Sequence, residues 1–422
     1  MTHISRLPLF LLLATAAAAP AFAQLQEGEK PTQEQVAAGE APAVAFDESE
    51  RVIRRLADPT LAPKWKKGPA KDLLAYVERI GEEGLDPADY DVEKLRAAID
   101  DGDSTLLSNT ASDIFLRVSA DLATGHASAD ARVDWHVIDP DLDAGEQFAL
   151  MKKAIDNDSV RDSLDSLLPT HPQYAELKGV LSHTTEQAKR DKIRTNLERW
   201  RWLPRDLGPR YVIVNVPAYT VALVENGQVV TRHNAVVGAV KTPTPQLSAI
   251  ATGVILNPWW EVPTSISGEV RGKKGYVAVK NGESVRYRQP PGPSNALGRI
   301  KVVMPNNQAI YLHDTPSKSL FAKAVRAFSH GCIRTQDPLG FAELLLDNPK
   351  WDKAAIDAAV AAKKTIQAQA SAPTPVYITY FTAAAAANTN ELVSYRDIYG
   401  RDAPVATALN RTGPAAAMAS SK

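Results

Sequence analysis

The chain has 422 residues, with 48 basic and 49 acidic side chains and a formal net charge of −1. Such a balance gives no electrostatic reason to expect a nucleic-acid partner. The composition is globular, with 44% hydrophobic residues, and this length predicts one to three domains. Because Cys332 is the only cysteine, an internal disulfide is excluded.

The first 23 residues predict a secretory signal peptide. Arg6 precedes an apolar run over residues 7–19, and the small residues Ala21 and Ala23 suit a cleavage site. The run is shorter than the roughly 20 apolar residues that span a bilayer. We therefore expect an exported, periplasmic protein without a stable membrane anchor, whose mature part begins with a flexible polar leader over residues 24–46.

Residues 47–202 carry helical periodicity and predict a helical domain. One expected helix ends at the C-cap glycine Gly125, and a single long helix is expected over about residues 174–202. We expect the acidic residues of this domain, together with His126 and His136, to be solvated surface, and we assign them no chemistry. Another expected helix has one apolar face formed by Leu73, Leu74, Val77 and Ile80.

Residues 203–410 predict a mainly antiparallel β-domain, because β-branched residues with a period of two begin near Arg210. Asn226-Gly227 predicts the two-residue turn of a hairpin. Two helices are expected late in the domain, one capped by Asp337 and one over about residues 352–362. Residues 411–422 predict a disordered tail. The expected strands cover residues 211–216, 220–225, 228–237, 249–256, 300–304, 309–313, 376–381 and 391–396.

A loop rich in proline and glycine interrupts these strands over about residues 257–298. It contains the adjacent tryptophans Trp259 and Trp260. Two tryptophans in a proline-bounded loop can plug a core or form the wall of a binding site, and the residues leave both interpretations open.

The chemistry is expected between residues 311 and 334. A thiol has an ordinary pKa of roughly 8.5, so Cys332 needs a nearby base or cation to act as a nucleophile at neutral pH. His313 can supply the base if the chain folds back between the two residues. We expect a helix to make that reversal, with one apolar face formed by Leu320, Phe321, Ala324, Val325 and Phe328.

Gly331 precedes the thiol and permits a strained turn whose N–H groups could face an oxyanion. Two other interpretations of Cys332 remain. It could be a small buried hydrophobic residue, as lone cysteines often are. It could also bind zinc together with His313 and His330, although no CxxC or HExxH pattern supports a metal site.

His313, fifteen intervening residues and then Ser329-His330-Gly331-Cys332-Ile333-Arg334 closely resemble the signature of the L,D-transpeptidases. Residues 84–90 and 121–125 resemble the scaffold domain of the larger, multidomain members. The Tyr-Gly-Arg-Asp at residues 399–402 resembles the end of the family's catalytic domain. The resemblance implies a β-sandwich-like catalytic fold, no cofactor, peptidoglycan stem peptides as substrates and carbapenem β-lactams as inhibitors.

The resemblance also implies residue roles. Cys332 would attack the carbonyl at the L-centre of the third residue of a tetrapeptide stem and expel D-Ala, and His313 would be the base. An amine from a second stem would then form a 3→3 cross-link. Supporting roles would fall to Tyr311, Ser329, His330 and Gly331 around the oxyanion. Arg334 would bind a substrate carboxylate or an internal acidic group, and Trp259 and Trp260 would belong to a lid over the site.

One departure from the family concerns the region before the β-domain, where many relatives carry a peptidoglycan-binding module. Only residues 183–192 occupy that junction here, which is too few for such a module. Three alternative functions stay open. Water as acceptor would give an L,D-carboxypeptidase, a lipoprotein lysine would give an anchoring enzyme, and loss of catalysis would leave a wall-binding protein.

Overall fold

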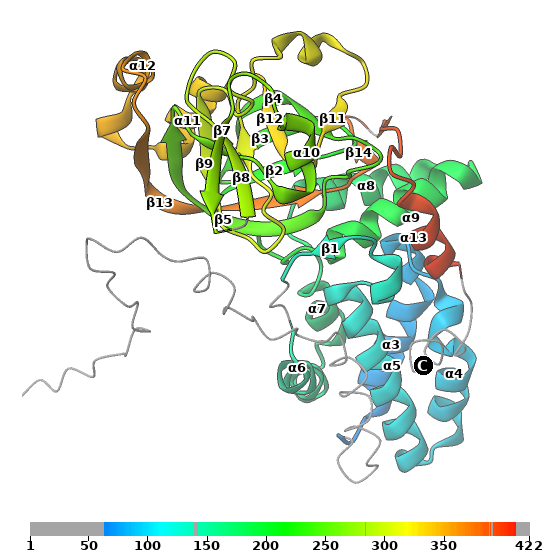
Figure 1. Ribbon diagram of the computed structural model, residues 1–422. Helices are drawn as coiled ribbons and strands as arrows, with labels where there is room; N and C mark the ends of the chain where they lie inside the picture. The colour runs from blue at the N-terminus through cyan, green and yellow to red at the C-terminus, as the bar shows by residue number, and fades with distance from the viewer. Residues whose placement is uncertain (1–62, 139–141, 283, 388, 390, 411–422) are drawn as a thin grey trace, which may run out of the picture. The chain divides into compact units, whose positions relative to one another are not determined.

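The computed structural model describes residues 63–138, 142–282, 284–387, 389 and 391–410 (Figure 1). The expected signal peptide, leader and C-terminal tail all lie outside these residues. Among the helices described, none combines the length and the apolar character needed to cross a membrane. The expected α+β class is confirmed, because a helical part precedes a strand-rich part.

The first part is built from helices around one apolar core. Its helices are α3 (Lys67–Glu78), α4 (Val92–Asp101), α5 (Ser104–Thr124), α6 (Ala144–Asp156) and α7 (Val160–Asp165). The side chain of Asp103 accepts two backbone N–H groups at the start of α5, and Gly125 ends that helix with φ +89°, as expected. The core contains the buried face of α3 and most of the buried apolar side chains of α5.

The expected long helix over residues 174–202 is wrong. The structure has two helices, α8 (Pro172–His183) and α9 (Gln187–Arg201), with extended backbone at Thr184 and Glu186 between them. The side chain of Thr184 donates to the carbonyl of Val180, and Arg190 donates to the carbonyls of Leu181 and Thr184. These bonds satisfy the end of α8 and so favour a break that the apolar periodicity does not reveal.

The second part is a large mixed sheet in which most strand pairs are antiparallel. Its strands run in the order β1-β5-β13-β2-β3-β4-β12-β10-β9, and β9 also pairs with β5. The expected hairpin is confirmed, since Asn226 and Gly227 take φ +48° and +76° between β3 and β4. These strands are β1 (Trp135–His136), β2 (Arg210–Asn215), β3 (Thr220–Glu225), β4 (Gln228–Gly238), β5 (Gln246–Leu256), β9 (Ile300–Val303), β10 (Leu312–His313), β12 (Ile333–Thr335) and β13 (Ile366–Thr379).

Two helices cover this sheet at the expected places, α11 (Pro338–Leu346) and α12 (Lys353–Ala361). Asp337 caps α11 by accepting the N–H of Gly340. The buried side chains of α11 and α12 belong to the core of the strand-rich part. The insertion over residues 257–298 holds its own small sheet, of order β6-β8-β7, formed by β6 (Trp260–Glu261), β7 (Val277–Asn281) and β8 (Ser284–Gln289), and a short helix, α10 (Ser267–Val270).

The expected helix between His313 and Cys332 is also wrong. A short 3-10 turn, Lys318–Ala322, is followed by the strand β11 (Ala327–Ser329), which pairs in parallel with β4. Val325 and Phe328, expected on a buried face, are 44% and 43% exposed. The guanidinium of Arg326 donates to the carbonyls of Tyr219 and Ala235. Pairing with β4 therefore outweighs the local helical periodicity.

The helical and strand-rich parts share buried side chains. Trp200 of α9 stacks on Phe381 at 4.3 Å between ring centroids, inside a third apolar cluster that also contains Tyr211 and Tyr377. The last helix, α13 (Asp402–Leu409), lies beside α9 and buries Val405 in the core of the helical part (Figure 1). The domain boundary at residue 202 remains a prediction.

Candidate active site

The register of two short parallel strands brings the sequence-predicted residues together. Leu312 of β10 lies opposite Ile333 of β12, and His313 lies opposite Arg334. Leu312 and Ile333 both point into the apolar core. Because side chains alternate across a strand, the neighbouring positions Tyr311, His313, Cys332 and Arg334 share the other face of the sheet.

His313 is buried and held in one tautomer. Its Nδ1 bonds to the carbonyl oxygen of Asp314, which can only accept, so Nδ1 carries the proton and Nε2 is left as an acceptor. Burial lowers the pKa of His313 to about 3, with the nearby charges of Arg334 and Lys301 adding to the effect of burial. The imidazole is therefore neutral at physiological pH, and its Nε2 carries no proton.

Asp314 fixes the peptide that holds this imidazole. Its buried carboxylate accepts the backbone N–H groups of Arg299 and Thr315, at 2.9 and 2.7 Å, and pairs with Lys318. A Cβ on Gly298 would lie 2.4 Å from the Asp314 side chain, so only glycine fits there. Sequence reasoning assigned no role to Asp314.

The Cys332 thiol is protonated in the resting site. Burial raises its pKa, and hydrogen bonds from Tyr311 together with the charges of Lys301 and Arg334 oppose that rise without cancelling it. A protonated thiol beside a neutral imidazole needs no resting ion pair. The site can therefore form the thiolate only as the proton moves to a base during the reaction.

Ser329 and Gly331 shape the turn that presents the thiol. Gly331 has φ +111°, where an L side chain would be strained. The Ser329 hydroxyl donates to the carbonyl of Cys332 at 2.6 Å and accepts the N–H of Gly331 at 3.1 Å. That N–H is engaged inside the turn, so Gly331 contributes conformation rather than an oxyanion donor.

We call the face shared by Tyr311, His313, Cys332 and Arg334 the cysteine–histidine row. The remaining predicted residues lie at the edge of this row. The side chain of His330 is half exposed, 3.4 Å from a carboxylate oxygen of Glu269 in α10. The Trp260 side chain lies close enough to the Tyr311 hydroxyl to lower its pKa, against the larger opposite effect of burial. Trp259 instead packs against Arg288, whose guanidinium carbon lies 4.4 Å from the centroid of the Trp259 ring. Only Trp260 reaches the cysteine–histidine row.

Two cations lie in the same row. Lys301 of β9 pairs with His313 across the antiparallel strands, and its ammonium lies 4.1 Å from the ring centroid of Tyr311. Burial lowers the pKa of both Lys301 and Arg334. The buried Nε of Arg334 has no hydrogen-bond partner among the described residues. Sequence reasoning missed Lys301, although a lysine between the buried strand residues Ile300 and Val302 is itself a signal of a functional face.

The loop between β4 and β5 supports the turn through hydrogen bonds from two threonines. Thr242 donates to the carbonyl of Ser329 at 3.0 Å, and Thr244 donates to the carbonyl of Gly331 at 2.7 Å. Sequence reasoning missed both threonines, because nothing in the Thr-Pro-Thr-Pro stretch connects it to a cysteine far along the chain.

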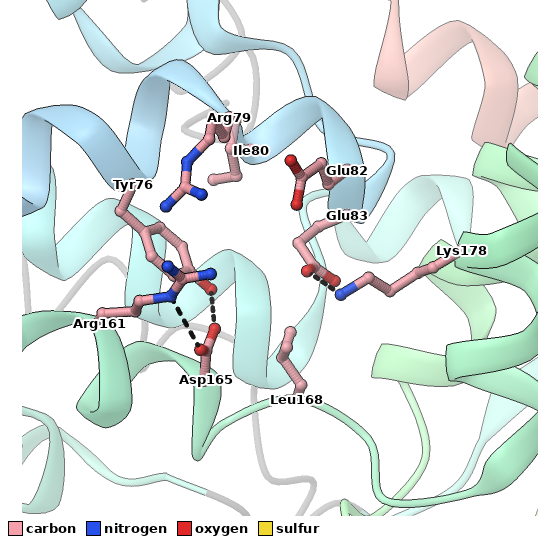
Figure 2. Close-up of a pocket in the computed structure, with 9 residues that line it drawn as sticks. All are labelled: Tyr76, Arg79, Ile80, Glu82, Glu83, Arg161, Asp165, Leu168 and Lys178. Carbon is pink, nitrogen blue, oxygen red and sulfur yellow. Dashed lines mark hydrogen bonds and ion pairs between the residues drawn. The ribbon is translucent and has the colours of Figure 1, made fainter. Parts of the chain in front are cut away.

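A cleft of about 210 Å³ lies elsewhere, among α3, α7 and α8 of the helical part (Figure 2). Its walls carry charges of both signs, and several of these are already paired, as Lys178 is with Glu83 and Tyr76 with Asp165. It holds no nucleophile. Within the described ranges, no three His, Cys, Asp or Glu side chains gather in a way that could hold a metal ion.

A thiol, a neutral imidazole and two partly buried cations on one face of a strand-rich domain define a cysteine–histidine site. The matched domain families agree with this class: an L,D-transpeptidase catalytic domain matches residues 209–378, and a scaffold domain matches residues 59–181. Residues 209–378 therefore form an L,D-transpeptidase catalytic domain, and residues 59–181 form a scaffold domain.

One curated relative is described as a "putative L,D-transpeptidase" of Haemophilus influenzae. It is 28% identical over 281 residues, which make up 59% of this chain and 56% of the relative. The chain thus spans little more than half of that relative's length.

Among solved structures, an L,D-transpeptidase from Mycobacterium smegmatis aligns with 40% of this chain and 58% of its own, at 16% identity and a TM-score of 0.23. L,D-transpeptidase 3 from Mycobacterium tuberculosis, in complex with a faropenem-derived adduct, aligns with 40% of this chain and 60% of its own, also at 16% identity and a TM-score of 0.23. These alignments are similarities only, and the assignment of the two domains rests on the two family matches.

Proposed function

We propose that this protein is a peptidoglycan L,D-transpeptidase that forms 3→3 cross-links through an acyl-enzyme on Cys332. The observation that carries the proposal is the neutral His313 imidazole, whose Nδ1 is bound to Asp314 and whose Nε2 is free, in the same row as a protonated thiol. A wall-binding protein has no use for that pair. The catalytic-domain match supports the same conclusion.

In the acylation step, His313 Nε2 takes the thiol proton while Sγ bonds to the carbonyl carbon at the L-centre of the third stem residue. The oxyanion accepts hydrogen bonds from the Cys332 N–H and the Tyr311 hydroxyl. As the tetrahedral intermediate collapses, the C–N bond breaks, His313 returns the proton to the amine and D-Ala leaves.

In the second step, an amine from a neighbouring stem attacks the thioester carbonyl. His313 accepts the amine proton, the C–S bond breaks, and the proton returns to the thiol. Water would resolve the same thioester to a tripeptide, so a transferase must exclude water and hold the amine in place. Trp260, whose side chain lies near the Tyr311 hydroxyl from the insertion, is suited to that task.

Arg334 binds a substrate carboxylate in this mechanism. Its buried, unpartnered Nε favours an external anion over an internal acidic group. Peptidoglycan stems lie outside the cytoplasmic membrane, so we also propose that the protein acts in the periplasm. The predicted signal peptide over residues 1–23 supports that location.

The test is to give purified protein tetrapeptide muropeptides and to separate the products by mass. We expect 3→3 cross-linked dimers in preference to tripeptides, and no product from Cys332→Ala. Tripeptide as the sole product, with ample acceptor present, would assign an L,D-carboxypeptidase. Transfer only to a lipoprotein lysine peptide would assign an anchoring enzyme, and binding without turnover would leave a wall-binding protein.

A further inference from the structure

The turn that carries Cys332 is held by a threonine hydroxyl whose two bonds are both used. Thr244 is fully buried, and its Oγ1 accepts the N–H of Gly238 at 2.8 Å while donating to the carbonyl of Gly331 at 2.7 Å. Gly331 directly precedes the nucleophile. A shift of Thr244 therefore moves the peptide that sets the direction of the Cys332 N–H.

The loop that carries Thr244 is in turn held by two residues near the C-terminus. The hydroxyl of Tyr399 donates to the carbonyl of Gly238 at 2.6 Å and accepts the N–H of Thr244 at 3.2 Å. The guanidinium of Arg401 donates from Nη1 to the carbonyl of Thr244 at 3.2 Å. Arg401 is 3% exposed and lies 5.0 Å from the Tyr399 ring centroid.

The other end of the Arg401 guanidinium reaches the scaffold domain. Nη2 pairs with the carboxylate of Asp134 at 2.7 Å. The segment around Asp134 is hydrogen-bonded to the catalytic sheet. The backbone carbonyl of Asp134 accepts the N–H of Gln246 at 3.0 Å, and β1 (Trp135–His136) pairs with β5. One planar side chain thus joins the scaffold to the loop behind the nucleophile.

We propose that Arg401 is a positioning residue through which Asp134 of the scaffold domain fixes the turn that presents Cys332. Arg401 contacts Thr244, and Thr244 contacts Gly331, so it acts on the nucleophile through the turn. A guanidinium can donate in two fixed directions at once, whereas an ammonium is a point charge that cannot span both partners in the same geometry. The scaffold domain then sets the efficiency of the catalytic domain rather than acting as a spacer. This inference rests on the proposed acyl-transfer function.

The first experiment measures the rate at which a carbapenem acylates Cys332, by intact mass at a temperature where every variant is folded. Arg401→Lys should react at least about tenfold more slowly than wild type, because oxyanion donors and nucleophile lose their alignment. Alkylation of the same thiol by iodoacetamide, which needs no oxyanion donor, should stay close to the wild-type rate. A large rise in alkylation would show general opening of the site and would overturn the positioning role.

Arg194→Lys is the matched control. Arg194 also joins distant segments through its guanidinium, from α9 to the carbonyls of Gly84 and Leu409, but it has no bond to the loop or turn. It should acylate at the wild-type rate even if its melting temperature falls as far as that of Arg401→Lys. Equal losses in the two variants would mean that stability, not position, controls the rate.

A double-mutant cycle then tests the route. Thr244→Val removes the hydroxyl, Thr244→Ser retains it, and only the first should slow acylation. Because Arg401 and Thr244 act in series, the double variant Arg401→Lys/Thr244→Val should slow acylation by less than the product of the two single-variant factors. In the double variant Arg194→Lys/Thr244→Val, the two factors should multiply. Multiplicative losses in both pairs would overturn the proposal. Failure of the wild type to acylate would instead overturn the proposed function.

Discussion

The Cys332 thiol and the His313 imidazole are both neutral in the resting site, so acylation depends on proton transfer at the moment of attack. Cys332→Ala should therefore abolish both muropeptide turnover and the carbapenem adduct. The fold should persist, because one sulfur from a partly buried position contributes little stability. Intact-mass spectrometry with circular dichroism checks both statements, and an adduct on the alanine variant would place the reactive group elsewhere.

The two histidines of the motif differ in burial and in partners, and we expect their substitutions to differ accordingly. His313→Ala should slow acylation by about 10²- to 10⁴-fold, the usual value of a positioned base. His330→Asn should cost much less, since its ring is half exposed and lies beside the carboxylate of Glu269. Single-turnover acylation rates measure the comparison. The opposite order would make His330 the base.

The low pKa of His313 predicts an unusual pH dependence. A free imidazole protonates near pH 6.5, but this one stays neutral down to about pH 3, because burial and the neighbouring cations oppose its charge. The acylation rate should therefore show no decline between pH 8 and pH 5. Stopped-flow or quenched mass measurements across that range test it. A fall centred near pH 6 to 7 would show that the base titrates normally.

At the residue scale, the sequence predicts the nucleophile, the base and the glycine turn, because their chemistry is local to one motif. It does not predict the partners that support them. Asp314 and Thr244 are ordinary polar residues in sequence, and only the fold brings the second of these to Gly331. Lys301 joins the site through strand register, which a single sequence does not determine.

At the scale of elements, the insertion contributes one tryptophan to the site and turns the other away. The Trp260 side chain lies near the Tyr311 hydroxyl, whereas Trp259 packs on Arg288. Trp260→Ala should shift the products from cross-linked dimers toward tripeptides, because water gains access to the thioester. Trp259→Ala is the matched control and should leave the ratio nearly unchanged. Equal shifts from both would mean that the insertion acts as a whole.

Elements set by local turn and capping chemistry were predictable, whereas the long helix over residues 174–202 and the helix before Cys332 were not. The Asn226-Gly227 hairpin and the capped helix after Asp337 depend on local chemistry and form as expected. The helix expected before Cys332 fails because residues 327–329 gain pairing with β4. His313 and Cys332 still come together, but through the pairing of the parallel strands β10 and β12 rather than through a helix.

At the scale of the whole molecule, charged residues that read as a solvated helix surface are interior. Glu198 and Arg201 of α9 are fully buried and paired at 2.7 Å, and Glu198 also accepts the N–H groups of Ala127 and Trp202. A Cβ on Gly125 would lie 2.5 Å from the Glu198 carboxylate. No periodicity argument reveals this interior, because the second partner of each charge lies far away in sequence.

His126 shows the same effect and was expected to be solvated. Its ring is largely buried, with Nδ1 bonded to Asp121 at 2.8 Å and Nε2 at 3.9 Å from Asp89. Burial by itself would lower its pKa, but the charge of Asp121, the hydrogen bond to it and the charges of Glu198 and Asp89 raise the pKa to about 9. The imidazolium is therefore the stable form at neutral pH, holding α5 to the segment of Asp89 and to α9.

This raised pKa makes the stability of the helical part depend on pH in a defined direction. The folded-state pKa of about 9 lies above the unfolded value near 6.5, so the stabilisation is complete below pH 6.5 and is lost as pH rises through 9. His126→Gln keeps a donor for Asp121 but no charge. Its melting temperature should fall below wild type at pH 6, and the gap should close by pH 10. A gap for His126→Gln that does not change with pH would mean that the ring is neutral and acts through packing alone.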